Sequence, residues 1–186
     1  GNSKQKVQDE QTPLLPDSPY AITKAAGMSA CRLYREHFHV FAACGILYNH
    51  ESAYRKDNFL SMKIIKAAIA AKKGSTAVTT VANLKARVDW GYAPDFVKAM
   101  RAILKLKQPD DFIIATGGAH TVADLAAVAF GHFKLDWKKY IKEDKSIVLE
   151  KRGVLVGKAA KLRRATGWKP SVDFDRMVKA IIKQLS

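Results

Sequence analysis

The sequence is poor in cysteine, in acidic residues and in long apolar runs. Of its 186 residues only 2 are cysteine, and the 17 acidic residues are outnumbered by 32 lysines and arginines. No run of about 18 or more apolar residues occurs, which predicts that the chain does not span a membrane. Cys31 and Cys44 lie in apolar stretches without the spacing of a metal site, so we interpret them as buried free thiols of a protein in the reducing cytoplasm. The histidines show no ligand spacing either, and we predict no metal site.

The excess of lysine and arginine gives a formal net charge of +15 at pH 7. A basic surface raises the rate of encounter with polyanions, and both nucleic acid and a diphosphate-linked sugar are candidates. The sequence has no helix-turn-helix, zinc-finger or aromatic-basic signature, and its cations are scattered along predicted helices. We therefore expect most of them on solvated helix faces, and we do not expect nucleic acid as a partner.

The Gly-x-Gly-x-x-Gly fingerprint that opens a dinucleotide-binding domain is also absent. Gly117-Gly118 lacks the third glycine and follows a late strand, so we interpret it as a turn. Elsewhere, segments of helical spacing alternate with short β-branched runs, and this alternation predicts an α/β fold. The expected helices cover 19–38, 58–73, 94–104, 121–133, 158–166 and 173–185, and the expected strands cover 39–48, 76–81, 112–116 and about 147–149.

Tyr20 and Lys24 form a Tyr-x-x-x-Lys pair at the start of the first expected helix. Asp17 or Ser18 can cap this helix, with Pro19 in its first turn. A spacing of four places Tyr20 and Lys24 on one helical face. An ordinary tyrosine, with a pKa near ~10, is a poor base at neutral pH, but a lysine ammonium one turn away favours the phenolate. The pair therefore predicts proton transfer at a sugar hydroxyl while a nicotinamide cofactor takes the hydride from the same carbon.

Further motifs lie in order along the chain. They are Ser18-Pro19-Tyr20-Ala21, Gly45-Ile46-Leu47-Tyr48-Asn49-His50-Glu51-Ser52, Lys63-Ile64, Asp89-Trp90-Gly91-Tyr92-Ala93, Ile114-Ala115-Thr116-Gly117 and Gly167-Trp168-Lys169-Pro170. With them the sequence resembles the extended short-chain dehydrogenase/reductase superfamily and, within it, most of all the GDP-mannose 4,6-dehydratases. Asn-His-Glu-Ser after a Gly-Ile-Leu strand is the most specific motif, whereas Gly-Trp-x-Pro and the Tyr/Lys pair are shared by many nucleotide-sugar epimerases, reductases and dehydratases. The resemblance extends over the whole chain, but only over the C-terminal half of the expected enzyme.

The resemblance assigns roles by position, in three groups. They are the catalytic pair Tyr20 and Lys24, the NADP contacts Lys24, His50 and Arg55, and the GDP-mannose contacts Asn49 and Lys63. We add Arg87 to the substrate contacts because it is adjacent to Val88, which stands where the family usually has an arginine before Asp-Trp. Tyr20 would be the acid/base of a reaction that oxidises C4 of the mannose, removes water across C5 and C6 and returns the hydride to C6. The implied product is GDP-4-keto-6-deoxy-mannose.

The resemblance also implies an architecture, the C-terminal part of a Rossmann-like doubly wound sheet plus a small α/β substrate-binding lobe. Residues 1–50 would be the C-terminal part of the dinucleotide-binding domain, and residues 51–186 mostly the nucleotide-sugar lobe interleaved with returning Rossmann elements. The Tyr20/Lys24 helix would pair with its mate in a homodimer. The family's Pro-Arg-Arg-Gly loop is here Ala53-Tyr54-Arg55-Lys56, which leaves a tetramer open. Because the cofactor fingerprint lies outside this chain, we expect the chain alone to be inactive.

Alternatives remain for the function and for single residues. The chain could belong to another nucleotide-sugar epimerase or reductase of the superfamily, or be an inactive basic remnant that binds polyanions. By itself His50 would be interpreted as structural, and its Asn-His-Glu-Ser setting reverses that preference. We expect Asp89 and Asp95 to cap and brace the helix that follows them, and Trp90 and Trp168 to be packing residues.

Overall fold

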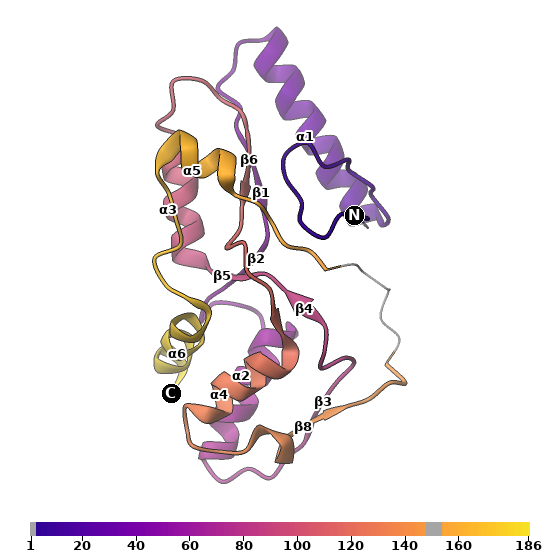
Figure 1. Cartoon of the computed structure of the whole chain (residues 1–186), viewed down its shortest axis with the longest axis vertical. Helices are drawn as coiled ribbons and strands as arrows, with labels where there is room; N and C mark the ends of the chain where they lie inside the picture. The colour runs from indigo at the N-terminus through magenta and orange to yellow at the C-terminus, as the bar shows by residue number, and fades with distance from the viewer. Residues whose placement is uncertain (1–2, 148–153) are drawn as a thin grey trace.

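The computed structural model describes residues 3–147 and 154–186, and in it helices and strands alternate along the chain (Figure 1). The α/β class predicted from the sequence is confirmed. The helices are α1 Pro19–His37, α2 Leu60–Lys72, α3 Ala93–Ile103, α4 Val122–Gly131, α5 Ala160–Thr166 and α6 Phe174–Leu185. The strands are β1 Cys44–Leu47, β2 Asn49–Glu51, β3 Thr79–Val81, β4 Arg87–Val88, β5 Trp90–Tyr92, β6 Asp111–Ile114, β7 His120–Thr121 and β8 Ile141–Glu143.

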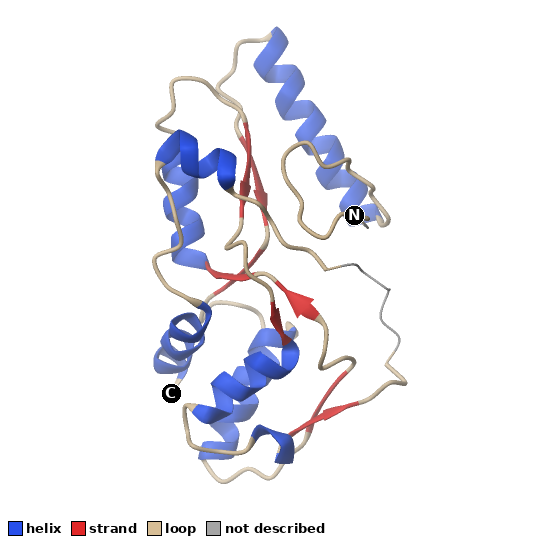
Figure 2. Ribbon diagram, viewed as in Figure 1, coloured by secondary structure: helices blue, strands red, loops and turns tan. Residues whose placement is uncertain are grey.

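The strands of the described part of the chain form four two-stranded sheets (Figure 2). The pairs β1–β6, β2–β5 and β3–β8 are parallel, and β4–β7 is antiparallel. Each parallel pair joins strands that are far apart in the sequence, as parallel pairing requires, with helices in the connections. The longest pair, β1–β6, aligns Cys44 with Asp111 and Leu47 with Ile114.

Buried apolar side chains gather in two clusters within the described residues. The larger one fills the space between α2, α4 and α6. The smaller one joins α3, β6 and α5 and includes the indole of Trp168, whose Nε1 donates to the carbonyl of Asp95 over 3.0 Å. Trp90 belongs to the larger cluster, so both tryptophans are packing residues, as predicted.

Local signals explain where the helices begin and end. Ser18 is the N-cap of α1, and its side chain accepts a hydrogen bond from the backbone N–H of Ala21. Thr121 and Asp124 form a reciprocal capping box at the start of α4. Gly167 ends α5 in the left-handed region, at φ 71°, where glycine has no steric penalty. The ends of all six expected helices therefore lie within two residues of the observed ones, and 121–133, for example, is two residues too long at its C-terminus.

Two predicted strands need correction. The buried strand expected over 39–48 is only the four-residue β1, which is half-buried, and the chain before it is a loop with His39 at φ 53°. β1 is short because its partner β6 begins at Asp111 and offers nothing to pair with earlier residues. The strand expected near 147–149 lies mostly outside the described residues; the strand observed in that region is β8, at 141–143.

Helix α1 lies beside the β1–β6 pair, on the side opposite α3 and α5 (Figure 1), and buries none of its own residues. Ionic contacts hold its C-terminal end. Arg35 pairs with Asp111 and donates from Nε to the carbonyl of Ala42 over 2.9 Å, and Arg32 lies 3.2 Å from the same Asp111 carboxylate. Asp110 is tied to Lys161 of α5 over 2.6 Å. The helix that carries Tyr20 is thus attached to β6 mainly by ion pairs near its C-terminal end, away from Tyr20.

We expect the 186-residue chain, made alone, to self-associate. Leu33, Tyr34, Phe38 and Phe41 are exposed on and after α1, and β1 has no strand on its second edge among the described residues. Size-exclusion chromatography with light scattering should show oligomers, and Leu33→Lys with Tyr34→Lys should raise the monomer fraction. A monodisperse monomer that melts cooperatively would contradict this expectation.

Candidate active site

A cavity of about 660 Å³ lies between α1, the segment 14–18 and β1. Tyr20, Lys24 and His50 all contribute to its lining, although 30 positions separate the first from the last. The remaining wall is largely apolar and includes Leu14, Leu15, Ile46 and Leu47. The lining also includes the polar residues Asp17, Ser18 and Thr23. The cavity therefore combines a few polar groups with an apolar surface, which is the usual composition of a small-molecule site.

Tyr20 and Lys24 lie one helical turn apart on the same face of α1, as their spacing predicts. The Lys24 ammonium lies over the Tyr20 ring, 5.3 Å from its centroid, within the range of a cation–π contact. The Tyr20 side chain is 72% exposed. The hydroxyl is thus accessible to a reactant, and a permanent positive charge stands beside the ring.

His50 is held by two contacts. Its Nδ1 lies 2.8 Å from the carbonyl of Tyr48, and its ring stacks on Phe96 with 5.1 Å between centroids. Because a carbonyl can only accept, Nδ1 carries the hydrogen, and Nε2 is left for another partner. β2 pairs with β5 at this point, with His50 opposite Gly91, so the histidine stands on a paired strand rather than on a free loop.

Arg55 is engaged elsewhere. Its guanidinium lies over the Phe59 ring at 3.6 Å, and its Nε is 3.4 Å from the carboxylate of Glu51. Glu51 is buried and also accepts a 2.6 Å hydrogen bond from the hydroxyl of Ser61 in the first turn of α2. Glu51 therefore joins β2 to α2.

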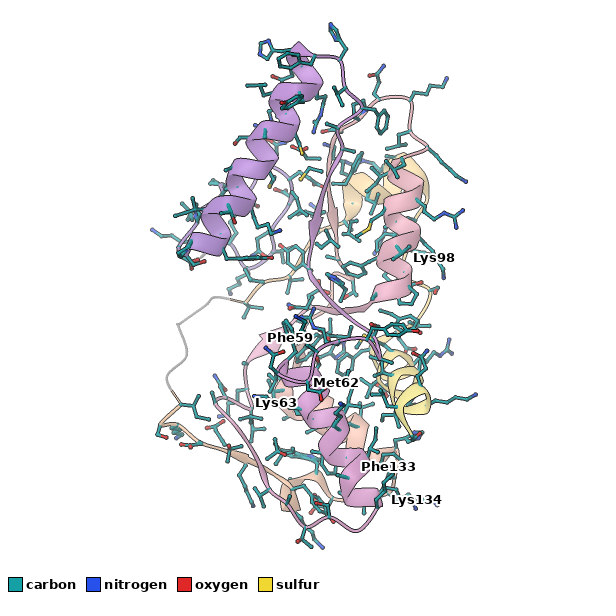
Figure 3. The ribbon with its side chains drawn as sticks, turned by 180° about the vertical axis from the view of Figure 1, so that it is seen from behind. Phe59, Met62, Lys63, Lys98, Phe133 and Lys134 are labelled. Carbon is teal, nitrogen blue, oxygen red and sulfur yellow. The ribbon has the colours of Figure 1, made fainter. Side chains whose placement is uncertain are left out.

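The three predicted substrate contacts lie apart from the cavity lining. Asn49 is exposed in β2, beside His50. Lys63 is exposed near the N-terminal end of α2, the end toward the middle of the molecule, where Figure 3 shows it close to Phe59 and Met62. Arg87 in β4 donates to the carbonyl of Ala119 over 3.2 Å. The structure thus groups Tyr20, Lys24 and His50, and it does not bring Arg55 or these three residues into the same cavity.

The expectation that Asp89 caps and braces the helix that follows it is wrong. It is fully buried and accepts from the backbone N–H groups of Thr116, Gly117 and Gly157 over 3.1, 3.1 and 3.3 Å, and from the hydroxyl of Thr116. It therefore holds the turn after β6 and a second, distant segment. A sequence pattern could not show this role, because its partners lie 27 and 68 residues away.

Asp95 does brace its surroundings, in the first turn of α3. Its carboxylate accepts from the backbone N–H of Ser171 over 2.7 Å and from the Ser171 hydroxyl over 2.6 Å, and Lys98 lies 3.0 Å away. Burial alone would raise the pKa of Asp95, but the hydrogen bonds from Ser171 and the ammonium of Lys98 outweigh it and hold the pKa below its usual value.

This pKa predicts a loss of stability in acid. A carboxyl group whose folded-state pKa is lowered stabilises the fold above its unfolded pKa, near ~3.9, and loses that contribution as pH falls through the lower folded value. In urea titrations Asp95→Asn should cost about 1.5–3 kcal/mol at pH 7, the worth of hydrogen bonds to a charged group, and progressively less as the pH is lowered below ~3.9. An equal cost over this range of pH would contradict the assignment.

Two further side chains beside the site have altered pKa values. Cys31 and Cys44 are free thiols that line the cavity and are half-buried, so the prediction of buried thiols is wrong in degree; burial raises the pKa of Cys44. Tyr48 donates to Gln8 over 2.9 Å, and burial raises its pKa to about 12. Tyr48 is therefore unsuited to act as a base near neutral pH.

Sequence reasoning missed the apolar wall. Leu14 and Leu15, in a proline-bounded loop, and Ile46, in β1, face the same space as Tyr20. The available signal was the Gly-Ile-Leu strand directly before His50. Nowhere in residues 3–147 or 154–186 do three or more His, Cys, Asp or Glu side chains gather as metal ligands. No helix in those ranges has both the length and the apolarity needed to cross a bilayer.

Comparison with known proteins shows which family the chain belongs to. The family model described as GDP-mannose 4,6 dehydratase matches residues 1–181. This chain belongs to the GDP-mannose 4,6-dehydratase family. GDP-mannose 4,6 dehydratase 2 of Arabidopsis thaliana is 40% identical over 178 residues, which are 95% of this chain and 48% of that protein. GDP-mannose 4,6 dehydratase of Homo sapiens is 32% identical over 200 residues, 98% of this chain and 54% of the relative. The chain thus spans about half the length of the curated relatives it matches.

Solved structures show the same fold at lower identity. The structure of RMD from Pseudomonas aeruginosa complexed with NADPH matches with a TM-score of 0.86 at 20% identity, over 94% of this chain and 58% of that one. The dTDP-glucose 4,6-dehydratase of Bacillus anthracis in complex with NAD matches with a TM-score of 0.84 at 20% identity, over 99% and 57%. The expected architecture, the later part of a Rossmann-like doubly wound fold, is therefore confirmed for this family member.

Proposed function

We propose that this chain supplies the acid/base pair and part of the cofactor and substrate walls of a GDP-mannose 4,6-dehydratase. The observation that carries the proposal is the cavity in which Tyr20, Lys24 and His50 converge, in a chain of this family. The activity requires the part of the relatives that this chain does not match, so we expect no turnover from the 186 residues alone. The two free thiols support a cytoplasmic location.

The cofactor in this proposal is NADP. The residues fit a nicotinamide nucleotide because the cavity offers an ammonium, an imidazole Nε2 and an apolar surface for a planar ring. Lys24 and His50 would hold it, and Arg55 would join them only by leaving Glu51 and Phe59. When bound there, the nicotinamide supplies the acceptor and later the donor of the hydride. Solved structures of the same fold are named as complexes with NADPH in one case and NAD in another, which supports the cofactor class.

The chain's own part in the reaction is the transfer of a proton at C4 of the sugar. Tyr20, whose hydroxyl is exposed to the cavity, takes the proton of the C4 hydroxyl as its carbon is oxidised, and returns a proton when the reaction needs one. The Lys24 ammonium lies over the same ring, 5.3 Å from its centroid, and lines the same cavity.

GDP-mannose is the substrate in this proposal, with Asn49, Lys63 and Arg87 as its contacts. All three are polar and lie outside the cavity lining, which suits groups that bind the remote nucleotide rather than the reacting sugar. The exposed apolar residues of α1 support a homodimer formed through this helix.

A chimera tests the function. This chain would replace the matching part of the Arabidopsis thaliana relative, to which it is 40% identical, and the chimera would be incubated with GDP-mannose and NADP. We expect a product lighter by one water, with a C6 methyl group and a C4 ketone in its NMR spectrum. A product that keeps its 6-hydroxyl would indicate an epimerase of the same superfamily and overturn the proposal. The parent enzyme, treated in the same way, is the positive control.

A further inference from the structure

A second cavity, of about 580 Å³, lies among β5, the loop after β6 and the segment that joins α5 to α6. It shares no lining residue with the Tyr20 cavity. The two are separated by the β2–β5 pair, because His50 lines the first cavity and its strand partner Gly91 lines the second. No role predicted from the sequence falls on its charged residues.

The second cavity is basic. Arg163, Lys169 and Arg176 contribute to its lining, against the single carboxylate of Asp173, so the charged side chains sum to 3 − 1 = +2. Arg176 lies 3.5 Å from Asp173 and is largely neutralised by it. Within the described ranges, neither Arg163 nor Lys169 has an acidic partner at salt-bridge distance. Two cations are therefore available to a ligand.

The small polar side chains of the cavity are already in use. The hydroxyl of Ser171 donates to Asp95, and that of Thr116 donates to Asp89. Lys98, which Figure 3 shows on α3, is bound to Asp95 over 3.0 Å. Recognition in this cavity thus depends on the charge of Arg163 and Lys169 and on the aromatic rings of His120 and Phe174.

Aromatic rings form one side of the second cavity. The His120 imidazole stacks on Phe174 with 3.9 Å between centroids and 5° between planes, and Phe174 in turn stacks on Trp90 at 5.9 Å. Because Phe174 and Trp90 belong to the larger buried cluster, core packing fixes the position of the stack. His120 is half-buried and stands at the top of the stack, at the edge of the cavity.

We propose that the second cavity binds a phosphate-bearing small molecule, with its phosphate or diphosphate on Arg163 and Lys169. A guanidinium and an ammonium in one concave site match phosphate oxygens in charge and in hydrogen-bond donors. The ligand is either a nucleotide, whose base would meet the His120 stack, or a smaller phosphate ester or diphosphate. The proposal is independent of the proposed function, since it rests on a different cavity.

Isothermal titration calorimetry of the 186-residue chain with pyrophosphate, mannose 1-phosphate and GDP tests the proposal. We expect saturable binding that weakens about tenfold or more in the double variant Arg163→Gln/Lys169→Gln, which removes two charge-assisted contacts. GDP binding more tightly than pyrophosphate would identify a nucleotide ligand, and equal binding would identify the phosphate groups alone. Self-association through α1 would leave this cavity free, because the segment that joins α5 to α6, which forms one of its walls, lies on the side of the molecule opposite α1 (Figure 1).

The matched control is Arg164→Gln/Lys179→Gln, which removes the same two charges from exposed positions on α5 and α6 outside the lining. This variant should bind as the wild type does. Equal weakening in both double variants would mean that diffuse surface charge attracts the anions, and would overturn the proposal. So would the absence of saturable binding to the wild type, or binding that is lost in Lys24→Gln instead, which would place the ligand in the other cavity. Circular dichroism melting confirms that each variant is folded.

Discussion

Replacing Tyr20 with phenylalanine in the chimeric enzyme should lower kcat by about 10²–10⁴, the usual contribution of a positioned acid/base group. The change removes only the hydroxyl, so the ring keeps its contact with the Lys24 ammonium. Because the side chain is exposed to the cavity, the fold should be unaffected. KM for GDP-mannose should change little, since the lost interaction belongs to the transition state. Initial-rate kinetics with detection of the keto sugar would measure both parameters.

The matched control is Tyr34→Phe, on the same helix. Tyr34 is about half exposed, packs against Phe38 in a tilted arrangement with 5.1 Å between centroids, and does not line the cavity. Its loss of a hydroxyl should leave kcat unchanged. If Tyr20→Phe retained turnover comparable with that of Tyr34→Phe, Tyr20 would not be the acid/base, and the proposed mechanism would be refuted.

Asp89→Asn should be the most destabilising single substitution at a polar position near the site. With its oxygen on the N–H groups of Gly117 and Gly157, the amide points its NH₂ at Thr116, whose hydroxyl can accept but whose backbone N–H loses its partner. One buried donor without a partner costs about 1–3 kcal/mol, and the remaining hydrogen bonds lose the charge of the carboxylate, so the free energy of unfolding should fall by about 2–5 kcal/mol. Urea unfolding followed by tryptophan fluorescence would measure it.

Asp173→Asn is the control for this change of carboxylate to amide. Asp173 is the exposed N-cap of α6, where its side chain accepts from the backbone N–H of Arg176 over 2.8 Å, and asparagine caps a helix about as well. This variant should change the free energy of unfolding by less than about 0.5 kcal/mol. Similar effects of the two substitutions would show that the Asp89 network contributes no more than an ordinary cap.

Much of the local structure could be predicted from the sequence because its causes act over a few residues. Ser18 caps α1, Gly167 ends α5, and the spacing of four brings Lys24 over the ring of Tyr20. The family could also be recognised, since its motifs are contiguous. Boundaries that depend on a distant partner were not predictable in this way. The strand expected over 39–48 is only β1, because its partner strand β6 begins at Asp111.

The sequence by itself determined the α/β class, the helix ends and the Tyr20/Lys24 pair, which are all properties of neighbouring residues along the chain. Only the tertiary structure decided which distant groups meet. It placed His50 in the cavity of Tyr20, directed Arg55 to Glu51 instead, and gave Asp89 its partners 27 and 68 residues away. The physical reason is that these contacts follow from strand pairing and core packing. Both depend on the whole chain at once, and no local pattern records them.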